Sequence, residues 1–340
     1  MVDNSALMRQ LLVHIFMADP DIQVVGTAGN ALEAREKIKA LHPDVLTLEI
    51  EMPGMDGLTF LEKLMRGHPM PVVMVSSLTE EGAEATLRAL ELGAVDYITK
   101  PRLDVSTGII EHADKIVARV KAAGQATVHA HGVSSAPAME KTPGNYRFSA
   151  TNKVVAIGSS TGGTEALRDL LAPLPANFPG IVIAQHMPPA FTGPFANRLD
   201  RLSQIQVKEA EDGDLILPGR ALLAPGGYQM EVETRGSGYA VRVYRGERVN
   251  RHIPSVDVLF SSCSKHLGRN AVGVILTGMG ADGAKGMLEM KQAKGFTIAQ
   301  DEASCVVFGM PREAIRLGGV DRVLPLDRIG NALLQALRLS

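Results

Sequence analysis

A serine turn bracketed by glycines, between a buried strand and a helix, constrains the fold of this chain most. Residues 154–157, VVAI, form the apolar run typical of a parallel strand covered on both faces. Residues 164–171 have the apolar spacing of a helix. Between them, Gly158-Ser159-Ser160-Thr161-Gly162 fits G-x-S-x-G, in which small neighbours let a sharp turn lift a hydroxyl above the sheet. We therefore expect Ser160 beside a helix N-terminus that would face a developing oxyanion.

The same turn has a second use, because glycine-rich strand-to-helix turns also hold phosphates. A dinucleotide-binding turn needs G-x-G-x-x-G, but Ser160 stands in the place of the second glycine. A P-loop needs Gly-Lys-Ser/Thr, which does not follow. Ser160 is therefore a candidate nucleophile, and an anion-binding hydroxyl is the alternative.

Length and composition exclude several classes of protein. The 340 residues suit two domains of about 120 to 190 residues. A net charge of -2 predicts no broad attraction for nucleic acid, and no apolar run approaches the roughly 20 residues of a membrane span. Met1-Val2-Asp3-Asn4 is no signal peptide. Cys263 and Cys305 lack the spacing of a disulfide framework or of metal ligands. We therefore expect both to be small core residues, and we expect the protein to work in a reducing cytoplasm.

Residues 1–121 alternate short apolar runs with amphipathic segments, as a doubly wound parallel α/β sheet does. The expected strands are Gln23–Ala28, Val45–Leu48, Val72–Ser76 and Tyr97–Thr99, and the expected helices are Ser5–Ala18, Ala31–Leu41, Gly57–Met65 and Glu80–Leu92. Polar residues gather just past the strand ends, where open α/β sheets place their sites. These residues are Asp3, Asn4, Glu49, Ser76, Ser77 and Lys100, and they predict an acidic pocket with one cation and one hydroxyl.

This first segment resembles a response-regulator receiver domain of the flavodoxin-like fold. The resemblance rests on VDNSALMR, LTLEIEMPGMDGL, VVMVSS and Thr99-Lys100-Pro101. In that family an acidic pair holds Mg²⁺, an aspartate accepts a phosphoryl group from a histidine kinase, and a hydroxyl and a lysine recognise the product. The resemblance places these roles at a receiver pocket of Asp3, Asn4, Glu49, Ser76 and Lys100, with Asp3 as the metal ligand.

Three departures put phosphorylation of this segment in question. The phospho-acceptor position is Glu49 instead of aspartate, Asn4 replaces the second acid, and almost none of an apolar first strand precedes Asp3. Glu49 reaches one methylene further and would misplace the attacked carboxylate. We expect that the domain is not phosphorylated normally and that Glu49 partly mimics the charged state. The alternative is an altered sequence whose departures report nothing about regulation.

Residues 122–150 are rich in Ala, Gly, Ser, Thr and Pro and predict a linker. His129 and His131 lie within it, and we expect solvated side chains there in preference to a weak metal site.

Residues 151–340 resume the buried-strand pattern and predict a second, larger and mostly parallel α/β domain. Apolar runs at 179–184 and 271–276 lead into His186 and Asp282. In an open parallel sheet these residues converge with Ser160 on one crevice, and alternating runs at 228–234 and 239–244 predict a β-hairpin beside it.

Ser160, His186 and Asp282 have the residue types of a nucleophile, its base and an orienting carboxylate. The backbone N–H of Met279 lies in a glycine-flanked turn and is a candidate oxyanion donor. The order Ser, His, Asp differs from that of α/β-hydrolases and the major serine proteases. His252 is a rival base, and Asn250-Arg251-His252 could contact an acidic helix or simply cover the sheet edge.

The second segment resembles the catalytic domain of the bacterial chemotaxis protein-glutamate methylesterase (CheB) family. The resemblance rests on IGSSTGGTEAL, QHMPPAFT, NRHIPSVDVLF, AVGVILTGMGADGAKGM and QDEASCVVFGMPREAI, in that order. It implies hydrolysis of glutamate methyl esters and deamidation of glutamines on chemoreceptors, by a monomer without a catalytic cofactor. It also implies a Ser160, His186 and Asp282 triad, with Thr161 and Met279 lining the site.

Overall fold

The structure is a computed structural model that describes residues 1–77, 79–100, 108–126 and 152–338. The chain divides into two units, Met1–Ser134 and Ser135–Ser340. Most of the predicted linker, with His129 and His131, lies outside the described residues. Helix α5 (Gly108–Gly124) continues past residue 121, where we expected the first domain to end.

The first unit contains a three-stranded parallel sheet in the order β1-β2-β3. Its strands are β1 (Leu46–Glu49), β2 (Val72–Ser76) and β3 (Asp96–Thr99), and its other helices are α1 (Ala6–Met17), α2 (Ala31–Leu41), α3 (Gly57–Gly67) and α4 (Glu80–Glu91). Strands β1 and β2 are buried along their whole length, as expected for parallel strands covered on both faces. Ser5, Asn30, Asp56 and Thr79 each accept a bond from the first turn of the helix that follows, so side-chain caps set these helix starts.

The expected strand Gln23–Ala28 is wrong, since only Ala28 makes a β-bridge within that segment. That bridge goes to Val2, which also bridges Leu48 of β1. Val2 is fully buried, and its backbone bonds to Thr47 and Glu49. Among the described residues, backbone bonds join residues 1–3 to this segment at Gly26 and Ala28 alone, which is too few for a ladder along residues 23–27.

The second unit contains a seven-stranded sheet in the order β12-β11-β10-β4-β5-β7-β6, and every pair in it is parallel. The strands are β4 (Val154–Ser159), β5 (Ile181–Gln185), β6 (Gln206–Glu209), β7 (Arg220–Leu223), β10 (Ala271–Ile275), β11 (Phe296–Gln300) and β12 (Arg322–Leu324). Strand β4 is central, with β5 and β10 as neighbours on opposite sides. The connection runs one way from β4 to β5 and the other way to β10, so the carboxyl end of β4 is a topological switch point.

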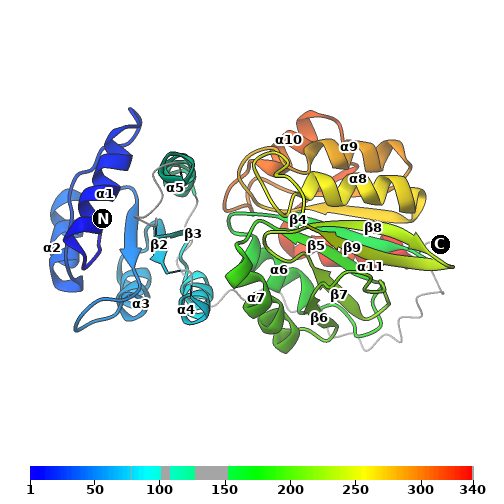
Figure 1. Cartoon of the computed structure of the whole chain (residues 1–340), viewed down its shortest axis with the longest axis horizontal. Coiled ribbons are helices and arrows are strands. Elements are labelled where there is room, and N and C mark those ends of the chain that lie inside the picture. The colour runs from blue at the N-terminus through cyan, green and yellow to red at the C-terminus, as the bar shows by residue number, and fades with distance from the viewer. Residues whose placement is uncertain (78, 101–107, 127–151, 339–340) are drawn as a thin grey trace. The chain divides into compact units, whose positions relative to one another are not determined.

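Helices cover both faces of this sheet (Figure 1), with α8, α9 and α10 over one face and α6 and α7 over the other, where α11 contacts α6. The helices are α6 (Gly163–Leu171), α7 (Pro189–Leu202), α8 (Val256–Leu267), α9 (Ala284–Gln292), α10 (Met310–Arg316) and α11 (Leu326–Arg338). The expected hairpin is present as β8 (Gln229–Arg235) and β9 (Gly238–Tyr244), and Val232 N–H of β8 donates to Ser262 Oγ of α8 at 2.8 Å. None of the described helices has both the length and the apolar character needed to cross a bilayer.

Helix α8 begins close against the central strand because β4 carries a glycine at that point. A Cβ on Gly158 would lie 2.2 Å from Val256 Cγ1 at the start of α8. Phe260 of α8 is fully buried and packs near Gly158 and Gly286 of α9. These close approaches bring the N-terminus of α8 to the carboxyl edge of the sheet.

Replacing Phe260 by alanine is expected to lower the free energy of unfolding of the second unit by about 3–5 kcal/mol, because it leaves a cavity where α8, β4 and α9 meet. Leu202→Ala is the control, since Leu202 is 46% exposed at the end of α7 and should cost less than about 1 kcal/mol. Urea unfolding of both variants measures the difference. Equal losses in the two variants would contradict this account of the core.

Candidate active site

His186 and Asp282 are in contact at the carboxyl edge of the second sheet. His186 directly follows β5, and Asp282 lies in the turn between β10 and α9. Their Nε2 and Oδ2 atoms are 2.8 Å apart, and both residues are buried. Gly280 and Gly283 have φ values of 87° and 90°, so glycine permits the turn that carries Asp282 to this position.

The Asp282 carboxylate accepts bonds from the start of α8 as well as from His186. Ser255 Oγ and Asn250 Nδ2 donate to Oδ1 at 2.8 and 2.7 Å, and Val256 N–H donates to Oδ2 at 2.7 Å. Burial alone would raise the pKa of Asp282, but the bonds from His186, Asn250 and Ser255 hold that pKa well below its usual range. The carboxylate is therefore a fixed negative charge beside the imidazole.

The bond to Asp282 fixes which nitrogen of His186 can exchange a proton. Nε2 faces the carboxylate and carries the hydrogen of a neutral ring, so Nδ1 is the basic nitrogen. Nδ1 is buried and has no hydrogen-bond partner among the described residues. The ring of His252 stacks on His186, with centroids 3.6 Å apart and planes 2° apart, so the rival base lies in the same site.

Ser160 lies just past the end of β4, between the strands that lead to His186 and to Asp282. Its N–H donates to Thr277 O at 3.0 Å, and Gln185 Nε2 donates to its carbonyl at 3.0 Å. A Cβ on Gly278 would lie 2.8 Å from Ser160 Cβ, so the turn after β10 approaches the serine closely. Within the described part of the chain, no group bonds to Ser160 Oγ. The structure therefore places the hydroxyl at the same edge as the His186–Asp282 pair, without a bond to the ring.

The turn after β10 supplies a candidate oxyanion donor. The Gly278 carbonyl accepts bonds from Gly309 and Met310, which fix the peptide plane before Met279. Across the described residues, nothing accepts from the Met279 N–H, and its side chain is half-buried. Thr161 is buried, and its carbonyl accepts from Thr277 Oγ1 at 3.0 Å.

Sequence reasoning missed Ser255 and did not connect Asn250 with Asp282. Ser255 is the N-cap of α8, and a serine ahead of an apolar helix with Asp257 in its first turn is a recognisable helix start. That signal could have located the start of α8. It could not have shown that Asp282, 27 positions further along the chain from Ser255, accepts from its hydroxyl.

The first unit brings Glu49 and Lys100 of the receiver pocket together in an ion pair. Burial raises the pKa of Glu49, although the Lys100 ammonium opposes this effect. Asn4 Nδ2 is engaged with Glu51 O at 2.9 Å. Ser76 Oγ is buried against α4, where it contacts Thr86 Oγ1 at 2.6 Å and Gly82 O at 3.1 Å. The Ser76 carbonyl accepts from Lys100 N–H at 2.8 Å, but the hydroxyl does not join the Glu49–Lys100 pair.

The receiver pocket does not fit a magnesium ion well. Asp3 Oδ2 is buried without a hydrogen-bond partner, which would suit a cation, but Glu49 is already neutralised by Lys100. Asn4 supplies no charge, and no group of three His, Cys, Asp or Glu able to hold a metal occurs in the described ranges.

Cys263 and Cys305 are buried free thiols, and burial raises the pKa of each to about 12.

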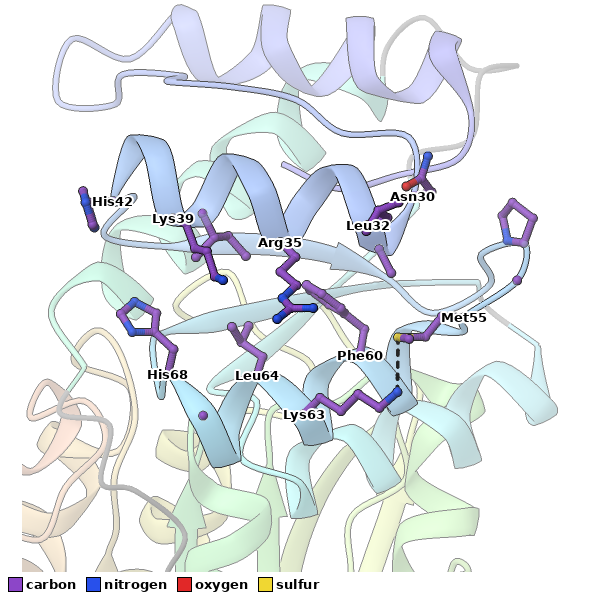
Figure 2. Close-up of a pocket in the computed structure, with 15 residues that line it drawn as sticks. Asn30, Leu32, Arg35, Lys39, His42, Met55, Phe60, Lys63, Leu64 and His68 are labelled. Carbon is purple, nitrogen blue, oxygen red and sulfur yellow. Dashed lines mark hydrogen bonds between the residues drawn. The ribbon is translucent and has the colours of Figure 1, made fainter.

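A cavity of about 900 Å³ lies in the first unit between α2 and α3 (Figure 2). Phe60 and Leu64 of α3 face Leu32 and Arg35 of α2 across it. Its lining includes no residue of the receiver pocket, so it belongs to neither predicted site.

Comparison with known proteins agrees with both halves of this description. Residues 155–333 match the model of the CheB methylesterase family, and residues 1–107 match the response regulator receiver domain. Proteins of Salmonella typhi and Escherichia coli K12 named protein-glutamate methylesterase/protein-glutamine glutaminase are 56% identical over 333 residues, covering 98% of this chain and 95% of theirs.

A solved structure, the CheB methylesterase catalytic domain of Thermotoga maritima, is 41% identical to this chain with a TM-score of 0.53. The match covers 54% of this chain and 97% of the Thermotoga maritima chain. Both family models and the relatives match the segments that carry the serine turn and the receiver pocket. The chain therefore belongs to the CheB methylesterase family and carries an N-terminal response regulator receiver domain.

Proposed function

We propose that this protein hydrolyses glutamate methyl esters on chemoreceptors and deamidates receptor glutamines, as the names of its relatives indicate for them. The observation that supports the assignment to residues is the 2.8 Å contact between His186 and Asp282, at the same edge of the sheet as Ser160. A nucleotide-dependent enzyme would place glycine at Ser160. A silent scaffold would not need a buried imidazole with an unpartnered nitrogen.

In the acylation step, His186 Nδ1 takes the proton of Ser160 Oγ as the oxygen attacks the ester carbonyl carbon. The Met279 N–H and the N-terminus of α6 stabilise the oxyanion that forms. The imidazolium then returns the proton to the methoxy oxygen, and methanol leaves. The product is an acyl ester on Ser160, and Asp282 stays ionised throughout.

In the deacylation step, His186 Nδ1 takes a proton from water, which attacks the acyl carbon. The same proton passes to Ser160 Oγ as the acyl bond breaks, releasing a glutamate side chain. With a glutamine substrate the first leaving group is ammonia, and the second step is unchanged. The scheme uses only side chains and backbone groups of this chain, so we propose that catalysis needs no cofactor.

For the receiver segment, we propose that Glu49 and Lys100 hold a constant ion pair in place of a phosphorylation switch. In ordinary receivers the charge beside the lysine changes when the aspartate is phosphorylated, whereas an unphosphorylated Glu49 keeps the same pairing with Lys100 throughout. The poor fit of the pocket to magnesium supports this proposal. A chemotaxis histidine kinase is the expected phosphodonor of the family, and here its effect on activity should be small.

Replacing Ser160 by alanine is expected to lower methanol release from methylated receptor membranes by at least about 10³-fold, because the covalent step is lost. Ser237→Ala, in the exposed turn of the hairpin, is the matched control and should keep full activity. Gas-phase transfer of radiolabelled methanol measures the rate, and a serine-directed fluorophosphonate should label the control but not Ser160→Ala. A fully active Ser160→Ala protein would refute the assignment of the nucleophile.

Asp282→Asn is expected to lower the free energy of unfolding by about 2–3 kcal/mol near neutral pH, because an amide NH₂ would face donors that the carboxylate accepts from. The pKa of Asp282 is lower in the folded than in the unfolded chain. Its stabilising contribution is therefore fully present above about pH 5 and is lost as the pH falls below about 4.

Urea unfolding at a series of pH values compares the Asp282→Asn chain with wild type. The exposed Asp327→Asn is the control, and it should cost much less than Asp282→Asn at neutral pH. A difference between Asp282→Asn and wild type that grew as the pH fell would contradict the lowered pKa.

Glu49→Asp combined with Asn4→Asp is expected to restore phosphorylation by a small phosphodonor with magnesium, since the shorter side chain leaves room for the phosphoryl group beside Lys100 and the second carboxylate supplies the charge that Asn4 lacks. The wild-type chain should give no stable acyl phosphate under the same conditions. Phosphorus NMR and intact-protein mass spectrometry report the adduct. A stable adduct on wild-type Glu49 would overturn the proposal of a constant ion pair.

A further inference from the structure

A short segment over the triad, residues 245–252, joins the hairpin to α8 and is called the strap here. The His252 ring stacks on His186, and Asn250 Nδ2 donates at 2.7 Å to both Asp282 and Asp257. Further back, the Glu247 carbonyl accepts from Gln229 Nε2 at 2.9 Å. These bonds fix the strap at the edge of the active site.

The tip of the strap is a two-residue turn with an arginine where glycine is preferred. Val249 and His252 exchange backbone hydrogen bonds of 3.0 and 2.9 Å across Asn250 and Arg251. The φ values of Asn250 and Arg251 are 51° and 69°, which is the pattern of a type I′ turn. Asparagine suits the first position, but at the second a residue with a Cβ is strained and glycine is favoured. A strained backbone beside an active site points to a use for the side chain.

The strap carries a surplus of positive charge that the described residues do not neutralise. Arg248 and Arg251 are exposed, and no ion-pair partner for either occurs in the described part of the chain. Arg245 lies over the Tyr228 ring at 5.7 Å, and Glu247 is the one acid in the strap. The guanidinium groups next to the triad are therefore available to a binding partner.

A groove of about 410 Å³ runs beside the strap and carries both lysines and acids. Val249 and Asn250 of the strap form part of its lining, with Lys265 of α8 and Lys285 of α9. Its acids are already engaged, since Tyr244 donates to Glu231 at 2.9 Å and Asn250 donates to Asp257 at 2.7 Å. Tyr244 and Asn250 are neutral donors, so Lys265 and Lys285 only balance Glu231 and Asp257, and the surplus positive charge next to the triad is that of the strap arginines.

We propose that Arg248 and Arg251, with the groove beside them, bind the carboxylate-bearing face of a helical substrate next to its reacting ester. This inference rests on the proposed function and names the contact that would select its substrate. In a helical substrate, side chains three and four positions from the ester lie on the same face as the ester. Each hydrolysis turns a neutral ester into a carboxylate, so a segment with several sites becomes more anionic as it is processed. The arginines then attract a partly processed segment more strongly than a fully esterified one.

The test compares Arg248→Gln/Arg251→Gln with wild type on methylated receptor membranes. The double variant is expected to raise KM roughly three- to tenfold with kcat little changed, and to flatten the fall of kcat/KM with added salt. Arg201→Gln is the matched control, because Arg201 is an exposed arginine at the far end of α7 from His186. Fluorophosphonate labelling of Ser160 should be equal in all three chains, since this small probe carries no carboxylate. An unchanged KM in the double variant would overturn the proposal.

Arg251→Gly separates docking from structural effects of the strap. Glycine relieves the strained φ, so the melting temperature should stay equal or rise while KM rises. A wild-type KM in Arg251→Gly would overturn the role of this side chain.

A second readout keeps the docking test independent of catalysis. Co-sedimentation of the Ser160→Ala chain with the same membranes should fall when Arg248→Gln/Arg251→Gln is added. Absence of methanol release from every chain would count against the proposed function, while this sedimentation result would still decide the docking surface. Equal sedimentation with and without the arginines would refute it.

Discussion

The second unit depends on one buried carboxylate, that of Asp282, which bonds simultaneously to His186 and to the start of α8. The backbone N–H groups of Val256 and Asp257 both point at it, at 2.7 and 3.3 Å. An anion at this end of a helix satisfies donors that have no partner inside the helix and favours its dipole. The residue that orients the imidazole is thus also the residue that anchors α8, and the strap joins the same centre through Asn250.

The parallel sheet explains how residues so far apart in sequence reach this centre. Strands β10, β4 and β5 are neighbours, so the residues that follow them emerge side by side at one edge. Glycines then remove side chains where segments must approach closely: Gly158 admits the start of α8, and Gly278 lies against Ser160. The site is therefore built on rigid strand ends, and its one loop component, the strap, is bonded at several points.

The sequence predicted the elements that have strong local signals. The strand before Ser160, the hairpin and the placement of His186 and Asp282 after strands all followed from apolar runs and turn residues. Long-range partners did not, because nothing local links Asn250 or Ser255 to Asp282. The expected strand Gln23–Ala28 failed for a related reason, since β structure needs a neighbouring strand and residues 1–3 bond to this segment only at Gly26 and Ala28. Ser76 shows the same limit: it is the last residue of β2 instead of lying past the strand, and its hydroxyl bonds to α4.

Because Asp282 holds both the start of α8 and the imidazole, it affects how such an enzyme loses activity on heating or in storage. Fraying of the first turn of α8 withdraws donors from the carboxylate and loosens the imidazole in the same motion. Inactivation should then begin as a local opening at this helix end, before the sheet loses any cooperativity. Amide exchange at Val256 and Asp257 would be its earliest sign, so a catalyst with a seemingly intact core can already have lost its turnover.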